Sequence, residues 1–171
     1  MRITIIGCGH LGATHAACMA SIGHEVLGVD IDESKVALLN SGKGWFHEPG
    51  LNEMLTENIR IGRLRFTTSF AEAGSFAKVH FIGVATPGRP DGSYDLSQLY
   101  AAVSSLLPHV IRNSLIIGKS TVPPGTAAAL QIMVDNELGD VRGGVEIAWN
   151  PEFLREGRAV EDTLSLDLSH C

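Results

Sequence analysis

The chain has 171 residues, of which 44% are hydrophobic and 19% are charged, and its formal net charge is −6. This balance is typical of one globular domain with a substantial core and excludes a disordered chain. The negative charge argues against a nucleic-acid surface, and no apolar stretch reaches the ~20 residues of a membrane span. Three cysteines without a CxxC pair, together with an N-terminus unlike a signal peptide, favour a reducing cytoplasm.

Apolar runs of strand length alternate with helical patterns along the chain. We expect strands at Arg2–Ile6, Glu25–Val29, Leu64–Thr67, Lys78–Val84, Ser114–Lys119 and Val145–Trp149. Helices are expected between them, with a further short helix capped by Ser69, at Leu11–Ile22, Glu33–Asn40, Leu51–Ile61, Leu96–Leu107 and Thr126–Leu138. Because the strands are almost continuously apolar, helices should cover both faces of the sheet. The predicted fold class is therefore α/β, a single-domain, doubly wound parallel sheet.

A glycine pattern, Gly7-Cys8-Gly9-His10-Leu11-Gly12, stands between the first expected strand and the first expected helix. In such a G-x-G-x-x-G pattern, the first glycine permits a tight turn and the second lets a pyrophosphate approach the backbone. The third allows the helix to pack closely on the strand. The N-terminus of the helix supplies N–H groups and the positive end of a dipole to the phosphates. An unliganded glycine turn is the alternative, but the strand–turn–helix context favours a Rossmann-like, dinucleotide-binding domain.

Asp30 ends the next expected strand, roughly 20 residues after the glycine pattern. An acidic residue at this place accepts hydrogen bonds from the ribose of an adenosine. Asp30 and Asp32 would repel a 2′-phosphate, and no arginine adjoins them. The sequence therefore favours NAD over NADP.

Three later segments each follow an expected strand, at the edge where ligands bind in such sheets. The first, Val84-Ala85-Thr86-Pro87-Gly88, has short residues across which a cofactor can lie, but it also fits an ordinary Pro-Gly turn. In the second, Ser120 and Thr121 precede a Pro-Pro-Gly turn, and their hydroxyls can orient a water or a nicotinamide, or merely cap a helix.

The third segment is Asn150-Pro151-Glu152-Phe153-Leu154-Arg155-Glu156-Gly157. If Pro151 begins a helix, Glu152 and Glu156 share one face, where two carboxylates near a cofactor can act as a base or hold a water. The alternative is a solvated charged helix that is paired through its arginines.

Cysteine and histidine predict no metal site. Cys8 lies in the glycine turn and Cys18 on the first helix, and both are expected to pack as small hydrophobes. His10 and His15 are not at the i, i+4 spacing of a helical metal pair. The loop Trp45-Phe46-His47 is expected to pack against the edge of the sheet.

Together these segments resemble the N-terminal, NAD-binding domain of the UDP-glucose/GDP-mannose dehydrogenase family, most closely that of the UDP-glucose 6-dehydrogenases. The resemblance runs from Met1 to about Leu164. Five segments carry it in order: GCGHLG with VDID, EPGL, GVATP, GKSTVPPGT and WNPEFLREG. His10 departs from the family's usual tyrosine, which is tolerable because backbone groups contact the phosphates there.

The resemblance implies that NAD is the cofactor and that the substrate is a nucleotide sugar, UDP-glucose first. The family oxidises the primary alcohol of the sugar twice, and two hydrides pass to NAD to give UDP-glucuronate from UDP-glucose. Thr121, Glu152 and Glu156 would hold a catalytic water or assist proton transfer, and the substrate would lie along Glu152, Phe153, Leu154, Arg155 and Glu156. The implied NAD contacts are Gly7, Cys8, Gly9, His10, Leu11, Gly12, Asp30, Lys35, Val84, Ala85, Thr86, Pro87, Gly88, Ser120, Thr121 and Glu156.

The family's catalytic cysteine lies in a Ser-Cys-Phe-Pro motif beyond position 171, together with the central helix of its dimers and its UDP-binding domain. Residues 165–171 depart from the family pattern, and Cys171 lacks the surroundings of a nucleophile. We therefore expect 1–164 to form an NAD-binding domain that is monomeric and incompetent alone. The alternatives are a non-catalytic NAD-binding module that needs a partner chain, a GDP-mannose 6-dehydrogenase, and a β-hydroxyacid type of dehydrogenase. The segments EPGL and NPEFLREG argue against the β-hydroxyacid type.

Overall fold

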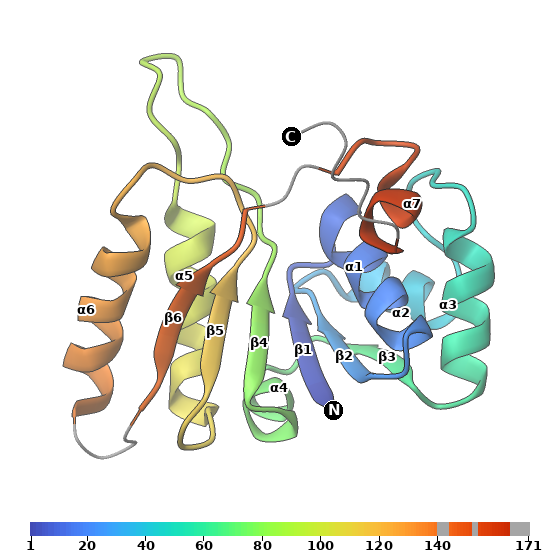
Figure 1. Ribbon diagram of the computed structural model, residues 1–171, viewed down its shortest axis with the longest axis horizontal. Coiled ribbons are helices and arrows are strands. Elements are labelled where there is room, and N and C mark those ends of the chain that lie inside the picture. Colours follow the sequence, from blue (N-terminus) through green and yellow to red (C-terminus); the bar gives the residue numbers. More distant parts are fainter. Residues whose placement is uncertain (140–143, 152–153, 165–171) are drawn as a thin grey trace.

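The computed structural model describes residues 1–139, 144–151 and 154–164, and it contains a six-stranded sheet with helices on both faces (Figure 1). The strands are all parallel and lie in the order β3-β2-β1-β4-β5-β6. Their bounds are β1 Arg2–Ile6, β2 Glu25–Val29, β3 Leu64–Thr67, β4 Val79–Ile82, β5 Leu115–Gly118 and β6 Glu146–Trp149. The predicted doubly wound α/β sheet is confirmed.

Two apolar clusters, one on each face, make up the core. Helices α1, α2, α3 and α7 contribute to the first cluster, and α4, α5 and α6 to the second. After the first residue, every residue of β1 and β2 is buried, as the apolar runs predicted. The helix bounds are α1 His10–Ser21, α2 Glu33–Asn40, α3 Leu51–Arg60, α4 Phe70–Phe76, α5 Ser97–Leu106, α6 Thr126–Leu138 and α7 Ala159–Leu164, with a 3₁₀ turn, η1, at Leu107–His109.

Polar caps and glycines set several of these bounds. The side chain of Asp32 accepts hydrogen bonds from the backbone N–H groups of Ser34 and Lys35 and so begins α2. Ser69 caps α4 in the same way, and Gly139 ends α6. The sequence signals for these helix ends are confirmed.

The segment after β6 differs from the prediction. Residues 154–158 are not helical, because the chain makes a turn in which Gly157 has a φ of +80°, and α7 begins only at Ala159. The condition under which Glu152 and Glu156 would share a helical face is therefore not met over residues 154–158. Glu152 and Phe153 lie outside the described residues.

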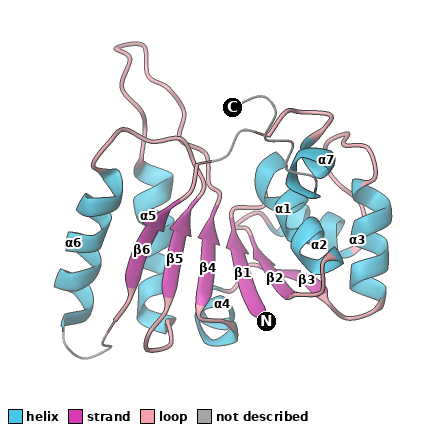
Figure 2. Cartoon of the chain, in the orientation of Figure 1, coloured by secondary structure: helices cyan, strands magenta, loops and turns pink. Residues whose placement is uncertain are grey.

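The carboxyl ends of the strands gather the loops that follow β1, β4 and β5 at one edge of the sheet (Figure 2). The loop between β4 and α5 projects beyond this edge and is closed by an antiparallel bridge between Gly88 and Tyr94 (Figure 1). Within the described ranges, no helix combines the length and apolar character that crossing a membrane requires.

Candidate functional site

A cleft of about 270 Å³ opens where the winding of the sheet reverses. Strand β1 leads to β2 on one side, its other neighbour β4 leads to β5 on the opposite side, and ligands bind at such a switch point in open α/β sheets. The glycine turn, the loop after β4 and the loop after β5 contribute the lining, which consists of Gly9, His10, Leu11, Gly83, Val84, Ala85, Thr86, Lys119, Ser120 and Thr121.

Each glycine of the turn has a different steric role. Gly7 has a φ of +88°, and a Cβ there would come within 2.9 Å of the Gly83 backbone. A Cβ on Gly12 would lie 1.8 Å from the carbonyl oxygen of Gly7, so α1 can lie this close to the turn only with glycine. Around Gly9, in contrast, a Cβ would meet nothing within 4 Å. The backbone of Gly9 therefore borders open space on the side where a ligand can approach.

The N-terminus of α1 is suited to an anion. The helix begins at His10 and its N-cap is Gly9, which has no side chain to occupy the N–H groups of the first turn. Such N–H groups and the positive end of the helix dipole bind phosphate oxygens. The open backbone at Gly9 and this helix end together fit the pyrophosphate of a dinucleotide.

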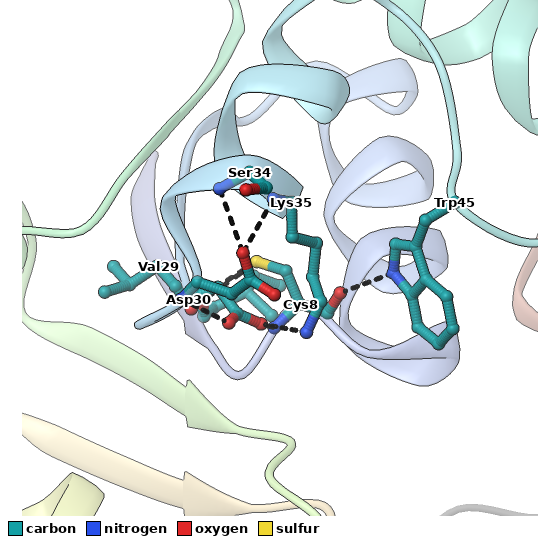
Figure 3. Close-up of polar contacts among 8 residues, drawn as sticks. Cys8, Val29, Asp30, Ser34, Lys35 and Trp45 are labelled. Carbon is teal, nitrogen blue, oxygen red and sulfur yellow. Dashed lines mark hydrogen bonds and ion pairs between the residues drawn. The ribbon is translucent and has the colours of Figure 1, made fainter.

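Asp30 directly follows β2 beside the turn, and its carboxylate is held from three sides (Figure 3). Oδ2 accepts the backbone N–H of Cys8 at 2.9 Å and the Lys35 ammonium at 3.1 Å, and Oδ1 accepts the N–H of Asp32 at 3.1 Å. The Lys35 Nζ also lies 5.4 Å from the centre of the Trp45 ring. The carboxylate and the ammonium thus stand together at the predicted ribose position.

Cys8 is fully buried, and its thiol points away from the cleft toward the carbonyl oxygens of Ile5 and Val29. Burial, with the Asp30 carboxylate beside it, raises the pKa of the Cys8 thiol well above its usual range. The backbone of Cys8 makes the hydrogen bonds at the turn: the N–H donates to Asp30, and the carbonyl accepts the indole N–H of Trp45 at 3.2 Å. Cys8 is thus a packing residue and not a nucleophile.

The loops after β4 and β5 are tied together by two hydroxyl groups. Ser120 Oγ donates to the carbonyl of Val84 at 2.6 Å, and Thr86 Oγ1 donates to the carbonyl of Thr121 at 2.7 Å. Neither Ser120 nor Thr121 caps α6, whose N-cap is Gly125. The buried Ser120 therefore fixes the shape of the cleft, while the exposed Thr121 lines it.

Trp149 supports this second loop from β6. Its indole N–H donates to the carbonyl of Ser120 at 3.0 Å, and its ring occupies the space above Gly118, where a Cβ would come within 2.4 Å of the ring atoms. With Trp45 on the glycine turn, both tryptophans of the chain thus contact loops that border the cleft.

The structure brings together most of the predicted cofactor residues. Those that line the cleft are Gly9, His10, Leu11, Val84, Ala85, Thr86, Ser120 and Thr121. Gly7, Cys8, Gly12, Asp30 and Lys35 shape or adjoin the turn, while Pro87 and Gly88 lead into the projecting loop. Two lining residues, Gly83 and Lys119, were not predicted, although each directly follows the end of a strand and precedes a predicted residue.

The predicted substrate residues that the structure describes lie apart from this lining. Leu154 is half-buried, and Glu156 is exposed in the turn before α7. The guanidinium of Arg155 makes two hydrogen bonds to the Asp162 carboxylate, at 3.0 and 2.6 Å, which hold the pKa of Asp162 down to about 2. No group of three or more histidine, cysteine or acidic side chains suited to a metal ion occurs among the residues described.

The loop 45–48 contacts the glycine turn, which follows β1 at the carboxyl edge of the sheet. The Phe46 ring lies 4.3 Å from the His10 ring, centre to centre, and Trp45 bonds the Cys8 carbonyl. Glu48 accepts a hydrogen bond from His10 Nε2 at 3.1 Å. Sequence reasoning did not assign Glu48 to the site, and its only signal was its place in the EPGL segment.

Comparison with known proteins identifies the domain. Residues 1–168 match the profile of the UDP-glucose/GDP-mannose dehydrogenase family, NAD binding domain. A GDP-mannose 6-dehydrogenase of Pseudomonas syringae pv. syringae is 41% identical over 168 residues, which are 95% of this chain and 38% of that protein. The UDP-glucose 6-dehydrogenase AglM of Haloferax volcanii is 44% identical over 172 residues, 98% of this chain and 40% of that protein.

Solved structures agree with this assignment. A ternary complex of GDP-mannose dehydrogenase from Pseudomonas aeruginosa has a TM-score of 0.88 at 36% identity and covers 95% of this chain, which spans 38% of that one. A UDP-glucose dehydrogenase from Pyrobaculum islandicum has a TM-score of 0.87 at 40% identity, and the match covers 94% of this chain and 38% of that one. The chain thus spans about two fifths of the length of its relatives. It belongs to the UDP-glucose/GDP-mannose dehydrogenase family, of which it comprises the NAD-binding domain.

Proposed function

We propose that this chain is the NAD-binding part of a nucleotide-sugar dehydrogenase that converts UDP-glucose to UDP-glucuronate. The observation that carries the proposal is the cleft at the β1–β4 switch point, with open backbone at Gly9 on one side and the Thr121 loop on the other. When bound there, NAD supplies the acceptor for the hydride of the sugar alcohol. The protein supplies position and polarity.

In this proposal each wall of the cleft holds a different part of the dinucleotide. The backbone N–H groups at the start of α1 bind the pyrophosphate, and Asp30 with Lys35 binds the adenosine ribose. The loops that carry Val84–Gly88 and Ser120–Thr121 border the nicotinamide.

The exposed hydroxyl of Thr121 holds a water or helps to move a proton, together with the carboxylates of Glu152 and Glu156. The sugar nucleotide lies along Glu152, Phe153, Leu154, Arg155 and Glu156. The exposure of Glu156 in the turn before α7 supports this role, because the carboxylate can reach a ligand without a prior loss of protein contacts.

Isothermal titration calorimetry of the 171-residue chain with NAD tests the proposal. We expect saturable binding of one NAD per chain and binding of NADP that is at least roughly tenfold weaker, since Asp30 and Asp32 repel a 2′-phosphate. Equal affinity for both dinucleotides would contradict the assigned ribose position, and absence of NAD binding would refute the proposal.

The identity of 41% to a GDP-mannose 6-dehydrogenase favours GDP-mannose as the second candidate substrate. The two sugars can be compared on the NAD-loaded chain by the backbone amide NMR signals of Thr121 and Leu154. Shifts with UDP-glucose but not with GDP-mannose support the first candidate, and the reverse supports the second. With either sugar we expect little or no uronic acid to be formed by the 171-residue chain, because the family's catalytic cysteine motif is not among these residues.

A further inference from the structure

Glu48 is a buried carboxylate whose hydrogen bonds join two distant parts of the chain. Its side chain is 0% exposed, and it lies in the loop between α2 and α3. Oε2 accepts His10 Nε2 at 3.1 Å and the backbone N–H of Gly157 at 2.9 Å, and Oε1 accepts the N–H of Val160 at 3.4 Å. A buried carboxylate is tolerated only when such donors compensate for lost hydration.

One end of this network is the glycine turn. His10 is the first residue of α1 and lines the cleft, and its ring is fixed by Glu48 on one nitrogen and by the Phe46 ring, 4.3 Å away. Nε2 is the ring nitrogen that faces the Glu48 carboxylate. Glu48 thus sets the orientation of a ring at the proposed pyrophosphate position.

The other end is the start of α7. Gly157 and Val160 are 109 and 112 residues from Glu48 in sequence, and their N–H groups belong to the turn and the first helical residues after the proposed substrate segment. Val160 also packs against the apolar cluster that contains α1. The position of this segment relative to the cleft therefore depends on the same carboxylate that orients His10.

We propose that Glu48 is a positioning residue for NAD: it holds His10 and the glycine turn in the binding arrangement and couples occupancy of the cleft to the 157–160 segment. The inference rests on the proposed placement of the pyrophosphate at the turn. It assigns Glu48 no contact with NAD itself.

A double-mutant cycle on NAD affinity tests the route through His10. We expect Glu48→Ala and His10→Ala each to raise the Kd by roughly 3- to 30-fold, and the double variant to bind no more weakly than His10→Ala alone. Glu48→Gln should recover much of the affinity, because one amide oxygen can still accept both His10 and Gly157. If the two single effects multiply in the double variant, Glu48 does not act through His10 and the proposal is overturned.

Two control variants separate positioning from general loss of stability. Glu53→Ala removes an exposed carboxylate from neighbouring α3 and should change neither the Kd nor the melting temperature. Leu55→Ala removes a fully buried side chain from the same apolar cluster, and it should lower the melting temperature while the Kd of the folded fraction stays within about twofold. A rise in Kd with Leu55→Ala as large as that with Glu48→Ala would show that Glu48 matters only for stability.

Amide hydrogen exchange of Gly157 and Val160, measured by NMR, tests the coupling. NAD should slow exchange of both amides in the unmodified chain and should have little effect on them in His10→Ala at saturating NAD. Unchanged exchange in an unmodified chain that binds NAD would overturn the coupling but leave the proposed function intact. Absence of NAD binding would refute both proposals together.

Discussion

Acid is expected to destabilise this domain through two buried histidines. His80, on β4, is 0% exposed; its Nδ1 lies 2.6 Å from Thr4 Oγ1, and its Nε2 has no hydrogen-bond partner among the described residues. His15, on α1, is 9% exposed and packs edge-on against the Phe81 ring. Burial lowers the pKa of both imidazoles to about 4, and for His15 the charge of Lys119 adds to this effect.

The direction of the pH dependence of stability follows from the number of protons that the folded and unfolded chains bind. Between the unfolded pKa of about 6.5 and the folded pKa of about 4, the unfolded chain binds protons that the native chain does not, so the free energy of unfolding falls as the pH falls. Each histidine should cost about 2 kcal/mol between pH ~8 and pH ~5, hence about 4 kcal/mol together. Domains of this kind have a total stability of about 5–15 kcal/mol, so the loss is large.

Urea unfolding followed by circular dichroism at about pH 8, 6.5 and 5 measures this loss. His80→Gln, whose amide can still bond Thr4 but does not titrate, should remove about half of the pH dependence. Asp162, whose pKa is lowered to about 2, contributes stability that is lost only as the pH falls below its unfolded value of about 3.8, outside this window. If the free energy of unfolding of His80→Gln depended on pH between ~6.5 and ~5 as strongly as that of the unmodified chain, the reasoning would be refuted.

Further predictions concern the turn and its neighbours. Gly12→Ala should lower both the melting temperature and the NAD affinity, because its Cβ would lie 1.8 Å from the Gly7 carbonyl oxygen. Gly9→Ala should preserve the melting temperature and weaken NAD binding by roughly tenfold or more. Calorimetry of both variants checks this prediction, and equal melting temperatures of the two variants would contradict it. Asp30→Asn should weaken NAD more than NADP, which the ratio of the two Kd values measures; an unchanged ratio counts against ribose recognition. The Cys8 thiol should resist iodoacetamide in the folded chain and react after denaturation, as peptide mass spectrometry can show, and rapid native labelling would contradict its burial and raised pKa.

The fold could be predicted because its signals are local. β-branched runs such as residues 3–6 are buried on both faces, and the caps Asp32 and Ser69 act within three residues of their own positions. The glycine turn was equally readable, since the requirement at Gly12 arises from a residue only five positions earlier in the chain. Local chemistry therefore determined the sheet, the helix starts and the position of the cleft.

The parts that could not be predicted depend on contacts between distant segments. The link from Glu48 to Gly157 spans 109 residues, and nothing in the EPGL segment indicates its partner. The spacing of the carboxylates allowed a helix from Pro151, but residues 154–158 are not helical, because Gly157 takes a left-handed turn and Arg155 pairs with Asp162. The spacing of polar and apolar residues reveals neither the turn at Gly157 nor the pairing of Arg155 with Asp162.

The most direct test of the account is a crystal structure of the 171-residue chain with NAD. We predict that the pyrophosphate lies against the backbone of Gly9 and the first turn of α1, with the adenosine ribose on Asp30 and the nicotinamide between the loops of Val84 and Thr121. NAD bound elsewhere on the domain, or with its pyrophosphate away from the glycine turn, would contradict the assignment of this cleft.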